Sequence, residues 1–251
     1  MGKIIAIANQ KGGVGKTTTC VNLSYALKSR QKKVLICDMD PQGNSTSGLG
    51  VDKTSAQTVY DMIINKVNAE NVLVESKYGD ILPANRELSG ATVELVEVEN
   101  REYVLKNALE PLRDKYDYIF IDCPPSLEML TLNALCAADT VLIPLQCEYY
   151  AMEGLSDLTN TIKMIKKRLN PEIEIEGIVL TMYDTRTKLS EQVAEEVRKF
   201  FGDKVYSVSI PRNVRLSEAP SHGRPAVVYD RISRGSRAYL RLASEFLKRQ
   251  V

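Results

Sequence analysis

The stretch that decides the fold reads "IIAIANQKGGVGKTTT" and covers residues 4–19. Its first part, Ile4–Ala8, is a short apolar run of the kind that forms a buried strand. A helical pattern begins at Lys16 and continues to about Lys28. A strand, a glycine-rich loop and a helix in this order are the context in which a loop binds phosphate. The pattern therefore predicts a phosphate-binding loop between the strand and the helix.

The glycines of this loop deviate from the ordinary motif. The usual spacing would place a glycine at position 10, where the chain has Gln10. Gly12, Gly13 and Gly15 nevertheless allow the backbone around Val14 to approach a phosphate and to point its amides inward. We therefore expect the loop from Gly12 to Gly15 to bind nucleotide.

Four side chains complete the predicted phosphate site. Lys16 is expected to lie on the β- and γ-phosphates, and the Thr17 hydroxyl is expected to ligate Mg²⁺. Thr18 can reach a neighbouring phosphate at the helix N-terminus. Lys11 is a second lysine that an ordinary loop does not require.

Carboxylates follow two other apolar runs. "YDYIFIDCPPS" contains a run that ends in Asp122, which is expected to hold Mg²⁺ through water. "VLICDMDPQGNSTSG" contains Asp38 and Asp40, two residues apart on one side of the chain. Taken alone, this pair would be interpreted as loop caps. Beside a phosphate loop, one of the two is expected to orient the attacking water.

Apolar runs alternate with helical patterns along the chain. The runs are nearly continuous, which is typical of strands buried on both faces of a parallel sheet. The sequence predicts an α/β fold of the P-loop NTPase type: a single domain, residues 1–251, with a doubly wound, mostly parallel sheet and helices on both faces. The predicted strands are Ile4–Ala8, Val34–Cys37, Tyr118–Ile121, Val141–Leu145, Ile175–Leu180 and, more weakly, Val205–Val208.

Positive and negative charges nearly cancel in the whole chain, but they are unevenly distributed along it. The net charge is +1, yet the segment from Arg186 to Val251 holds 14 Lys and Arg against 7 Asp and Glu. Such asymmetry is typical of a face that meets polyanions, although a solvated surface explains it equally well. One predicted helix carries a basic stripe formed by Arg234, Arg237, Arg241 and Lys248, with Tyr239, Leu242, Ala243 and Phe246 on the opposite face.

Cysteine and histidine usage argues against a zinc site. The five cysteines are scattered without Cys-x-x-Cys spacing, and His222 is the only histidine. An odd, scattered set without a signal peptide fits the reducing cytosol. No apolar run approaches the ~18 residues of a membrane span. We expect a cytoplasmic protein without a membrane partner.

Four motifs in order resemble one known family. "KGGVGKTT", "DMDPQGNSTSGLG", "FIDCPPS" and "IPRNVRLSEAPSHGRP" are similar to the deviant Walker A ATPases of the ParA/Soj type, which partition chromosomes and plasmids. The resemblance covers nearly the whole chain. It implies ATP and Mg²⁺ as cofactors and a slow intrinsic ATPase. It also implies an ATP-driven homodimer that binds non-specific double-stranded DNA on the nucleoid, until a ParB/Spo0J-type centromere-binding partner stimulates hydrolysis.

The resemblance also implies roles for residues around the phosphates. Lys11 matches the family's signature lysine, which reaches across a dimer to the nucleotide of the other subunit. Together with Lys16 it would neutralise the γ-phosphate from two sides. Asp40 matches the switch residue needed for hydrolysis. Asp122 matches the Walker B aspartate.

Four residues further along match the family's other contacts. The resemblance implies that Pro211 and Asn213 hold the adenine. It implies that Arg186 and Arg215 contact non-specific DNA in the dimer. Phosphate contacts of this kind need only cationic side chains and carry no sequence information.

Three alternatives compete with this interpretation. A MinD-like membrane ATPase resembles the chain in its loop, but it would carry an amphipathic membrane helix beyond the fold, which "EFLKRQV" does not provide. A reductase iron protein would need cysteines that bridge a cluster between subunits; Cys123 and Cys136 lie near the nucleotide strand, but their context resembles the ParA pattern. A nucleotide-binding protein without activity is disfavoured by Thr17, Asp40 and Asp122. Within the family, the sequence favours a chromosomal role and leaves a plasmid role open.

Overall fold

A central sheet of seven strands organises the computed structural model, which describes residues 1–54 and 57–250. The strand order is β3-β4-β2-β5-β1-β6-β7, and every pairing is parallel except that of β3 with β4. The strands are β1 (Lys3–Ile7), β2 (Val34–Asp38), β3 (Val74–Ser76), β4 (Gly79–Leu82), β5 (Tyr118–Asp122), β6 (Thr140–Gln146) and β7 (Glu174–Thr181).

The register of the central strands brings the predicted site together. Ile7, at the end of β1, pairs with Asp122 on one side and with Leu142 on the other. Asp38, at the end of β2, pairs with the same Asp122. Because parallel strands end at the same edge of a sheet, the phosphate loop and both carboxylates meet there, where ligands bind in open α/β folds.

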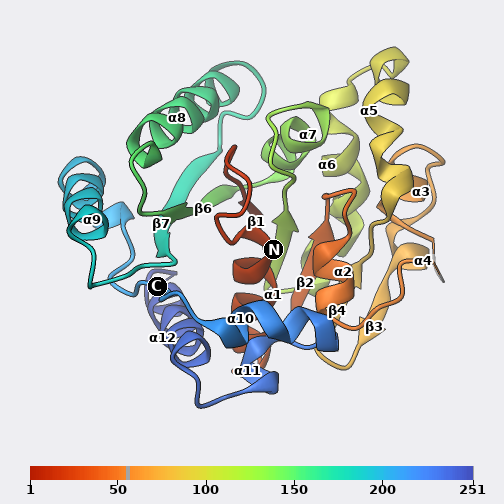
Figure 1. Ribbon diagram of the computed structural model, residues 1–251. Helices are drawn as coiled ribbons and strands as arrows, with labels where there is room; N and C mark the ends of the chain where they lie inside the picture. The colour runs from red at the N-terminus through yellow and green to blue at the C-terminus, as the bar shows by residue number, and fades with distance from the viewer. Residues whose placement is uncertain (55–56, 251) are drawn as a thin grey trace.

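Helices cover both faces of this sheet (Figure 1). One apolar layer packs α1 and α12 against the sheet, and a second layer packs α7, α8 and α9 on the other face. The predicted doubly wound, mostly parallel fold is therefore confirmed. The helices are α1 (Lys16–Lys28), α2 (Asn44–Gly48), α3 (Val59–Ile63), α4 (Ala69–Val72), α5 (Ala91–Glu94), α6 (Val104–Leu109), α7 (Met129–Ala137), α8 (Ala151–Arg168), α9 (Lys188–Phe201), α10 (Val214–Glu218), α11 (Ala226–Tyr229) and α12 (Arg234–Lys248).

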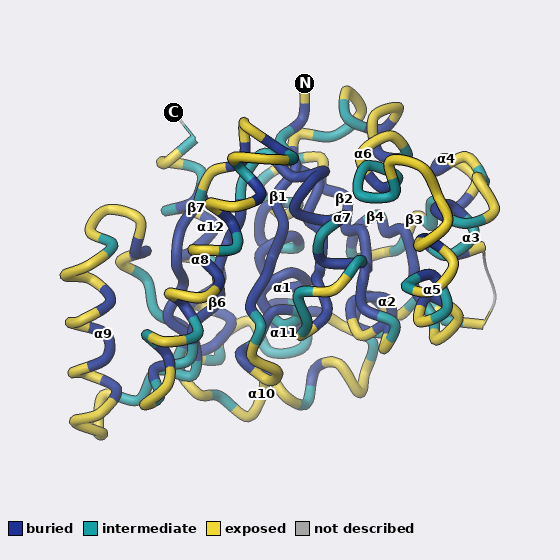
Figure 2. Tube along the Cα trace, turned by 90° about the horizontal axis from the view of Figure 1, so that it is seen from above, coloured by how far each residue is buried: buried dark blue, intermediate teal, exposed yellow. Residues whose placement is uncertain are grey.

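Helices α8, α9 and α12 are amphipathic, with one buried and one exposed face. The strands and the inner sides of the helices are buried, whereas the outer turns of rim helices such as α9 are exposed (Figure 2). In α12 the predicted apolar face is buried throughout: Tyr239, Leu242, Ala243 and Phe246. The arginines of the opposite stripe, Arg234, Arg237 and Arg241, are exposed. Burial of one helix face thus leaves the basic stripe at the surface.

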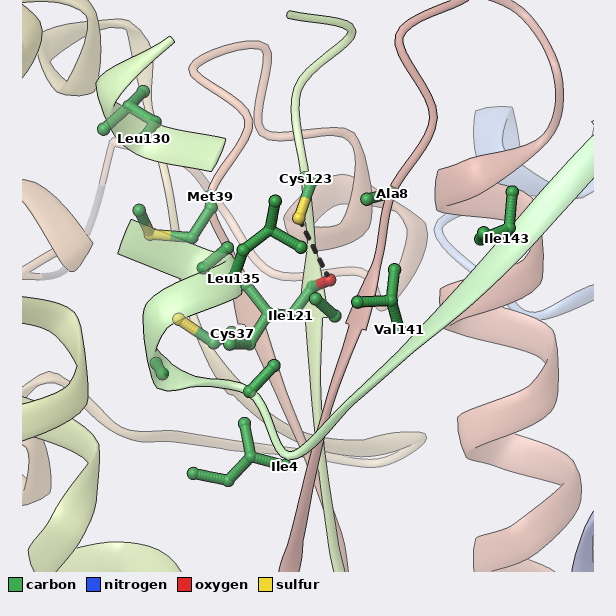
Figure 3. Packing of buried hydrophobic residues seen from close by; sticks show 14 of the residues in the cluster. Ile4, Ala8, Cys37, Met39, Ile121, Cys123, Leu130, Leu135, Val141 and Ile143 are labelled. Atoms are coloured by element: carbon green, nitrogen blue, oxygen red, sulfur yellow. Dashed lines mark hydrogen bonds between the residues drawn. The ribbon is translucent and has the colours of Figure 1, made fainter. Parts of the chain in front are cut away.

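The layer beneath α7 fixes the carboxyl end of β5. Ile121, Val141 and Leu135 pack together there, and the thiols of Cys37 and Cys123 lie in the same cluster (Figure 3). The Cys123 thiol donates to the carbonyl of Ile121 at 3.8 Å. A close-packed layer of this kind holds the strand ends, and with them the functional carboxylates, in fixed positions.

The predicted strand Val205–Val208 is wrong. Val205 forms a single bridge with Ile178, and the ladder stops there. The reason is a carboxylate that takes the place of a strand: the backbone amides of Ser207 and Val208 donate to Glu245 of α12 at 2.8 and 3.0 Å. These amides are therefore satisfied without a neighbouring strand.

The sequence analysis missed the hairpin β3–β4. Both strands are short, with three and four residues, and their side chains give too little periodicity to be recognised. β4 extends the parallel sheet beside β2, and β3 closes that edge in the antiparallel direction. A glycine at position 79 with φ of 153° makes the tight connection.

Candidate nucleotide site

The phosphate loop depends on glycine at two positions. Gly13 and Gly15 have φ of 75° and 89°, a region that favours glycine. A Cβ at Gly13 would meet no protein atom within 4 Å, so the loop presents a bare backbone there. The Thr181 hydroxyl, at the end of β7, donates to the carbonyl of Val14 at 2.8 Å and supports the loop from below. Gly15 is the N-cap of α1, which begins at Lys16 as predicted.

The two lysines of the loop have different surroundings. Lys16 is only 7% exposed, and its Nζ donates to the backbone carbonyl of Lys11 at 3.1 Å. Burial lowers the pKa of Lys16, an effect opposed by the nearby carboxylate of Asp122. The side chain of Lys11 points elsewhere and pairs with Glu148 near the surface. Lys16 therefore lies inside the cradle, whereas Lys11 lies on its rim.

Asp122 is buried at the mouth of the loop. Its Oδ2 accepts a hydrogen bond from the Ser45 hydroxyl at 2.7 Å, and its Oδ1 has no hydrogen-bond partner among the described residues. Burial raises the pKa of Asp122 to about 8, with a further contribution from the charge of Asp38, while the Ser45 hydroxyl and the nearby Thr17 hydroxyl oppose the rise. A buried carboxyl with a bare oxygen is costly in its ionised form unless a cation approaches it.

Asp38 and Asp40 differ in how their oxygens are used. Asp38 accepts from the backbone amide and the hydroxyl of Thr46 at 2.9 and 2.7 Å, and from the amide of Asp40 at 3.2 Å. Asp40 accepts from the amide of Gln42 at 2.9 Å through one oxygen only. Burial raises the pKa of Asp38 above its usual range. Asp38 thus holds the segment that begins α2, and Asp40 keeps one oxygen for other partners.

These residues fit a magnesium ion and a phosphate chain. The bare Oδ1 of Asp122 and the hydroxyl of Thr17 are hard oxygen donors, which Mg²⁺ prefers. The open backbone at Gly13 lies shortly before the start of α1, where helix N-terminal amides favour an anion. Thr18 follows Thr17 on the first turn and borders a small cavity of about 220 Å³.

The predicted adenine residues lie at the end of β7. Tyr183 bridges to Pro211, and its amide donates to the carbonyl of Ile210 at 3.0 Å. The Oδ1 of Asn213 is buried and has no hydrogen-bond partner in the described chain. This acceptor lies against Gly235 at the start of α12, where no described residue donates to it. Thr181, at the end of the same strand, holds the phosphate loop through Val14. The phosphate loop and the predicted adenine residues are therefore both attached to the end of β7.

The two predicted DNA residues both make ion pairs. Arg186 donates to both oxygens of Asp184 at 2.9 and 2.7 Å. Arg215 pairs with Glu218 at 2.7 Å and with Asp230 at 3.3 Å. Arg186 also lines a cavity of about 1170 Å³, together with a second set of arginines: Arg212, Arg234, Arg237 and Arg241.

These four side chains make no ion pair within the described part of the chain. They come from the loop at Pro211 and from the exposed face of α12, so we call this hollow the arginine groove. Phosphate contacts need cations that are free to approach them.

Comparisons with known proteins agree with this geometry. A family model described as "AAA domain" matches residues 2–175. The sporulation initiation inhibitor protein Soj of Bacillus subtilis is 56% identical over 248 residues, which cover 98% of each chain. The chromosome partitioning protein ParA of Myxococcus xanthus is 54% identical over 254 residues, or 100% of this chain and 90% of that protein. The chain belongs to the ParA/Soj family. It is an ATPase, as the sequence predicts.

A solved structure supports the same conclusion for the ParA/Soj fold. The cobyrinic acid a,c-diamide synthase of Mycobacterium smegmatis, with bound ADP and magnesium, is 37% identical and has a TM-score of 0.87. The match covers 100% of this chain and 96% of that one. ADP and magnesium in that structure are the kinds of cofactor that the sequence of this ParA/Soj member predicts.

The cysteines of this ParA/Soj chain do not suit a shared metal cluster. Cys123 and Cys136 are both buried in the apolar layer beneath α7, at 1% and 0% exposure. Burial raises the pKa of the Cys136 thiol to about 12, which disfavours the thiolate that binds metal. Among the described residues, no group of His, Cys, Asp or Glu could hold a metal ion by itself. The iron-protein alternative is therefore unsupported.

Several residues of the ParA/Soj site escaped the sequence analysis. Ser45 and Thr46 hold the carboxylates of Asp122 and Asp38, and their place in the quoted "DMDPQGNSTSG" motif is a signal that could have found them. Glu148 follows β6 as a single charge in an apolar context. No pattern in the sequence alone pairs it with Lys11.

Proposed function

We propose that this ParA/Soj-family ATPase binds ATP with Mg²⁺ at the phosphate loop and uses hydrolysis to ADP and phosphate to drive DNA partitioning. The observation that carries the proposal is the bare Oδ1 of Asp122, buried beside Thr17 at the mouth of the loop. Such a carboxylate calls for a cation, and the ammonium of Lys16 donates instead to the Lys11 carbonyl.

Each part of the loop has a chemical task. The Thr17 hydroxyl would ligate magnesium directly, and Asp122 would hold it through water. The bound ion would supply charge neutralisation to the phosphates. Lys16 would leave the Lys11 carbonyl and bind the β- and γ-phosphates. The backbone amides around Gly13 would donate hydrogen bonds to the same phosphate chain. Pro211 and Asn213 would hold the adenine.

Asp40 is the residue proposed to orient the attacking water. Its second oxygen makes no hydrogen bond to the described residues, whereas both oxygens of Asp38 are occupied by Thr46 and the Asp40 amide. A carboxylate on a turn next to the γ-phosphate position can direct a water without removing its proton completely. This account agrees with the slow intrinsic turnover expected for the family.

Lys11 is proposed to act on the nucleotide of a second subunit. Its side chain is about half exposed on the rim of the loop, and it points away from the cradle that Lys16 serves. Two cations that approach the γ-phosphate from opposite sides would neutralise it at a shared interface. ATP would then hold two subunits together, and hydrolysis would release them.

The arginine groove is proposed to bind the DNA backbone. Arg212, Arg237 and Arg241 are exposed and make no ion pair in the described chain, so they need not lose a partner when they meet a phosphate. Arg186 and Arg215 remain part of the proposal, although each must first give up a carboxylate. A dimer would double this surface and link ATP to DNA affinity.

The cellular cycle follows from these parts. The ATP-bound homodimer would bind non-specific double-stranded DNA in the cytoplasm, on the nucleoid, and a ParB/Spo0J-type partner would stimulate hydrolysis and release it. No helix in residues 1–54 and 57–250 is long and apolar enough to cross a membrane. The alternative is a MinD-like ATPase that binds membranes peripherally.

Sedimentation velocity with and without ATP tests the proposal. ATP and Mg²⁺ should shift the wild type to a dimer that co-sediments with DNA of unrelated sequences. Liposomes should not be bound. Lys11→Ala should keep nucleotide binding and lose the dimer. An undiminished dimer in this variant would contradict the role in trans, and binding to liposomes instead of DNA would favour the MinD-like alternative.

A further inference from the structure

The rim lysine of the phosphate loop is held by a carboxylate on another strand. Lys11 pairs with Glu148, which lies just beyond the end of β6. The other oxygen of Glu148 accepts a hydrogen bond from Gln146, and its carbonyl accepts from the amide of Ala151 at 2.9 Å. Glu148 is therefore fixed between β6 and the first turn of α8, and it presents one oxygen to the loop.

The backbone at Lys11 is attached to the same strand. Its amide donates to the side chain of Asn9 at 3.0 Å, and Asn9 donates in turn to the carbonyl of Pro144 in β6 at 2.8 Å. β1 and β6 are neighbours in the sheet, so their carboxyl ends lie together (Figure 1). The backbone of Lys11, through Asn9, and its side chain, through Glu148, are thus both held beside β6 of its own subunit.

The surface beside this pair is suited to a second copy of the chain. Tyr149 and Tyr150 follow Glu148 and stand edge to face, with ring centroids 5.0 Å apart. They are 76% and 67% exposed. Exposed aromatic side chains are enriched where proteins associate. Lys11, Glu148 and the two tyrosines therefore share one surface next to the phosphate loop.

We infer that Glu148 is a positioning residue that holds the Lys11 ammonium on its own subunit until two ATP-bound subunits meet. The inference rests on the proposed function, in which Lys11 serves the nucleotide of the partner. The Lys11 ammonium cannot pair with Glu148 and at the same time reach a γ-phosphate across the interface. The ion pair must open, and Glu148 thereby raises the protein concentration at which ATP drives dimerisation.

The size of the effect follows from the exposure of the pair. Both side chains are close to half exposed, and an ion pair of this kind contributes at most a factor of about five. A symmetric dimer opens two pairs, so the factor is squared. Removal of the pair should lower the dissociation constant of the ATP dimer by up to about 25-fold.

The test uses Glu148→Gln in the full chain, with Mg²⁺ and a non-hydrolysed ATP analogue. Sedimentation velocity over a range of protein concentrations gives the dissociation constant of the dimer. We expect tighter dimerisation than in the wild type. In the wild type, salt weakens both the pair that opens and the Lys11–phosphate contact that forms, so the two effects partly cancel; without the pair, the constant should depend more on ionic strength. Glu148→Asp, which keeps the charge but shortens its reach, should lie between the two.

Glu153→Gln is the matched control, because Glu153 is exposed on α8 and has no ion pair in the described chain. It should dimerise like the wild type. In the Lys11→Ala background, Glu148→Gln should have no further effect.

Two other outcomes are decisive. Unchanged or weaker dimerisation of Glu148→Gln, beside a wild type that dimerises and a Lys11→Ala variant that does not, would overturn this inference alone. A weaker dimer would place Glu148 among contacts to the partner. A wild type without any ATP dimer, or a Lys11→Ala variant that dimerises normally, would overturn the proposed role of Lys11 and this inference with it.

Discussion

The phosphate loop and the arginine groove meet at the end of β7 and are built in opposite ways. Thr181 supports the loop, and the next residues, from Tyr183 to Arg186, line the groove. In the loop the functional groups are buried, few and held by hydrogen bonds, as Lys16 and Asp122 show. In the groove the cations are exposed and make few contacts with the rest of the protein.

The difference reflects the two kinds of ligand. A site that performs chemistry must fix atoms within a fraction of an ångström, and buried, hydrogen-bonded groups provide that precision. A surface that meets a polyanion needs only charge that can follow the phosphates. Single substitutions should therefore have large effects in the loop and small, cumulative effects in the groove.

The largest effect is expected for Lys16→Ala. Removal of a buried cation from the phosphate position should lower ATP turnover by about 100-fold or more, because the charge of the transition state loses a preorganised partner. Steady-state release of phosphate measures the effect. Lys28→Ala, at the other end of α1, is the control and should be close to wild type. Turnover near wild type in Lys16→Ala would contradict the site as described.

A somewhat smaller effect is expected for Asp40→Ala. We expect turnover to fall by roughly 100-fold at most, while ATP binding and the dimer persist, since the proposed role of Asp40 is to orient the water rather than to bind the nucleotide. The comparison of turnover with sedimentation separates the two properties. Asp38→Ala should instead lower stability, because Asp38 holds Thr46 and the turn at Asp40. A normal rate in Asp40→Ala would refute its assignment.

The groove should respond more weakly. Arg237→Ala combined with Arg241→Ala should weaken binding to DNA by about tenfold, equally for unrelated sequences, and should reduce the salt slope by up to about four, because each dimer loses four arginines. Filter binding or anisotropy at several salt concentrations measures both. Lys163→Ala combined with Lys167→Ala removes equal charge from α8, on the opposite face, and should have little effect. A loss confined to some sequences would argue against phosphate contacts.

The smallest effect concerns stability and pH. The pKa of Asp122 in the folded protein is about 8, above its unfolded value of about 4, so the folded state binds more protons and stability falls as pH rises between them. The Asp122→Asn variant has no ionisable group at this position, so its stability does not fall with rising pH for this reason. Its melting temperature, without nucleotide or Mg²⁺, should exceed that of the wild type at pH 8, and by clearly less at about pH 5. The control is Asp114→Asn, at an exposed carboxylate. A difference independent of pH would contradict the raised pKa.

The sequence predicted the features that local chemistry fixes. Strands buried on both faces have nearly continuous apolar runs, so the central strands and the fold class followed from them. The start of α1 followed from Gly15, whose left-handed backbone suits glycine. β3 and β4 were too short to give a period, and the prediction of Val205–Val208 failed because a side chain, Glu245, took the place of a neighbouring strand.

The sequence by itself determined which residue types stand at the strand ends: the loop glycines, Lys16, Asp40 and Asp122, whose spacing within short motifs is a property of the chain. Only the tertiary structure decided their partners. Register between β1 and β6 brought Glu148 to Lys11, and helix packing turned three arginines of α12 toward the groove. The physical reason is that a pairing between distant segments depends on sheet order and packing, which no local pattern contains.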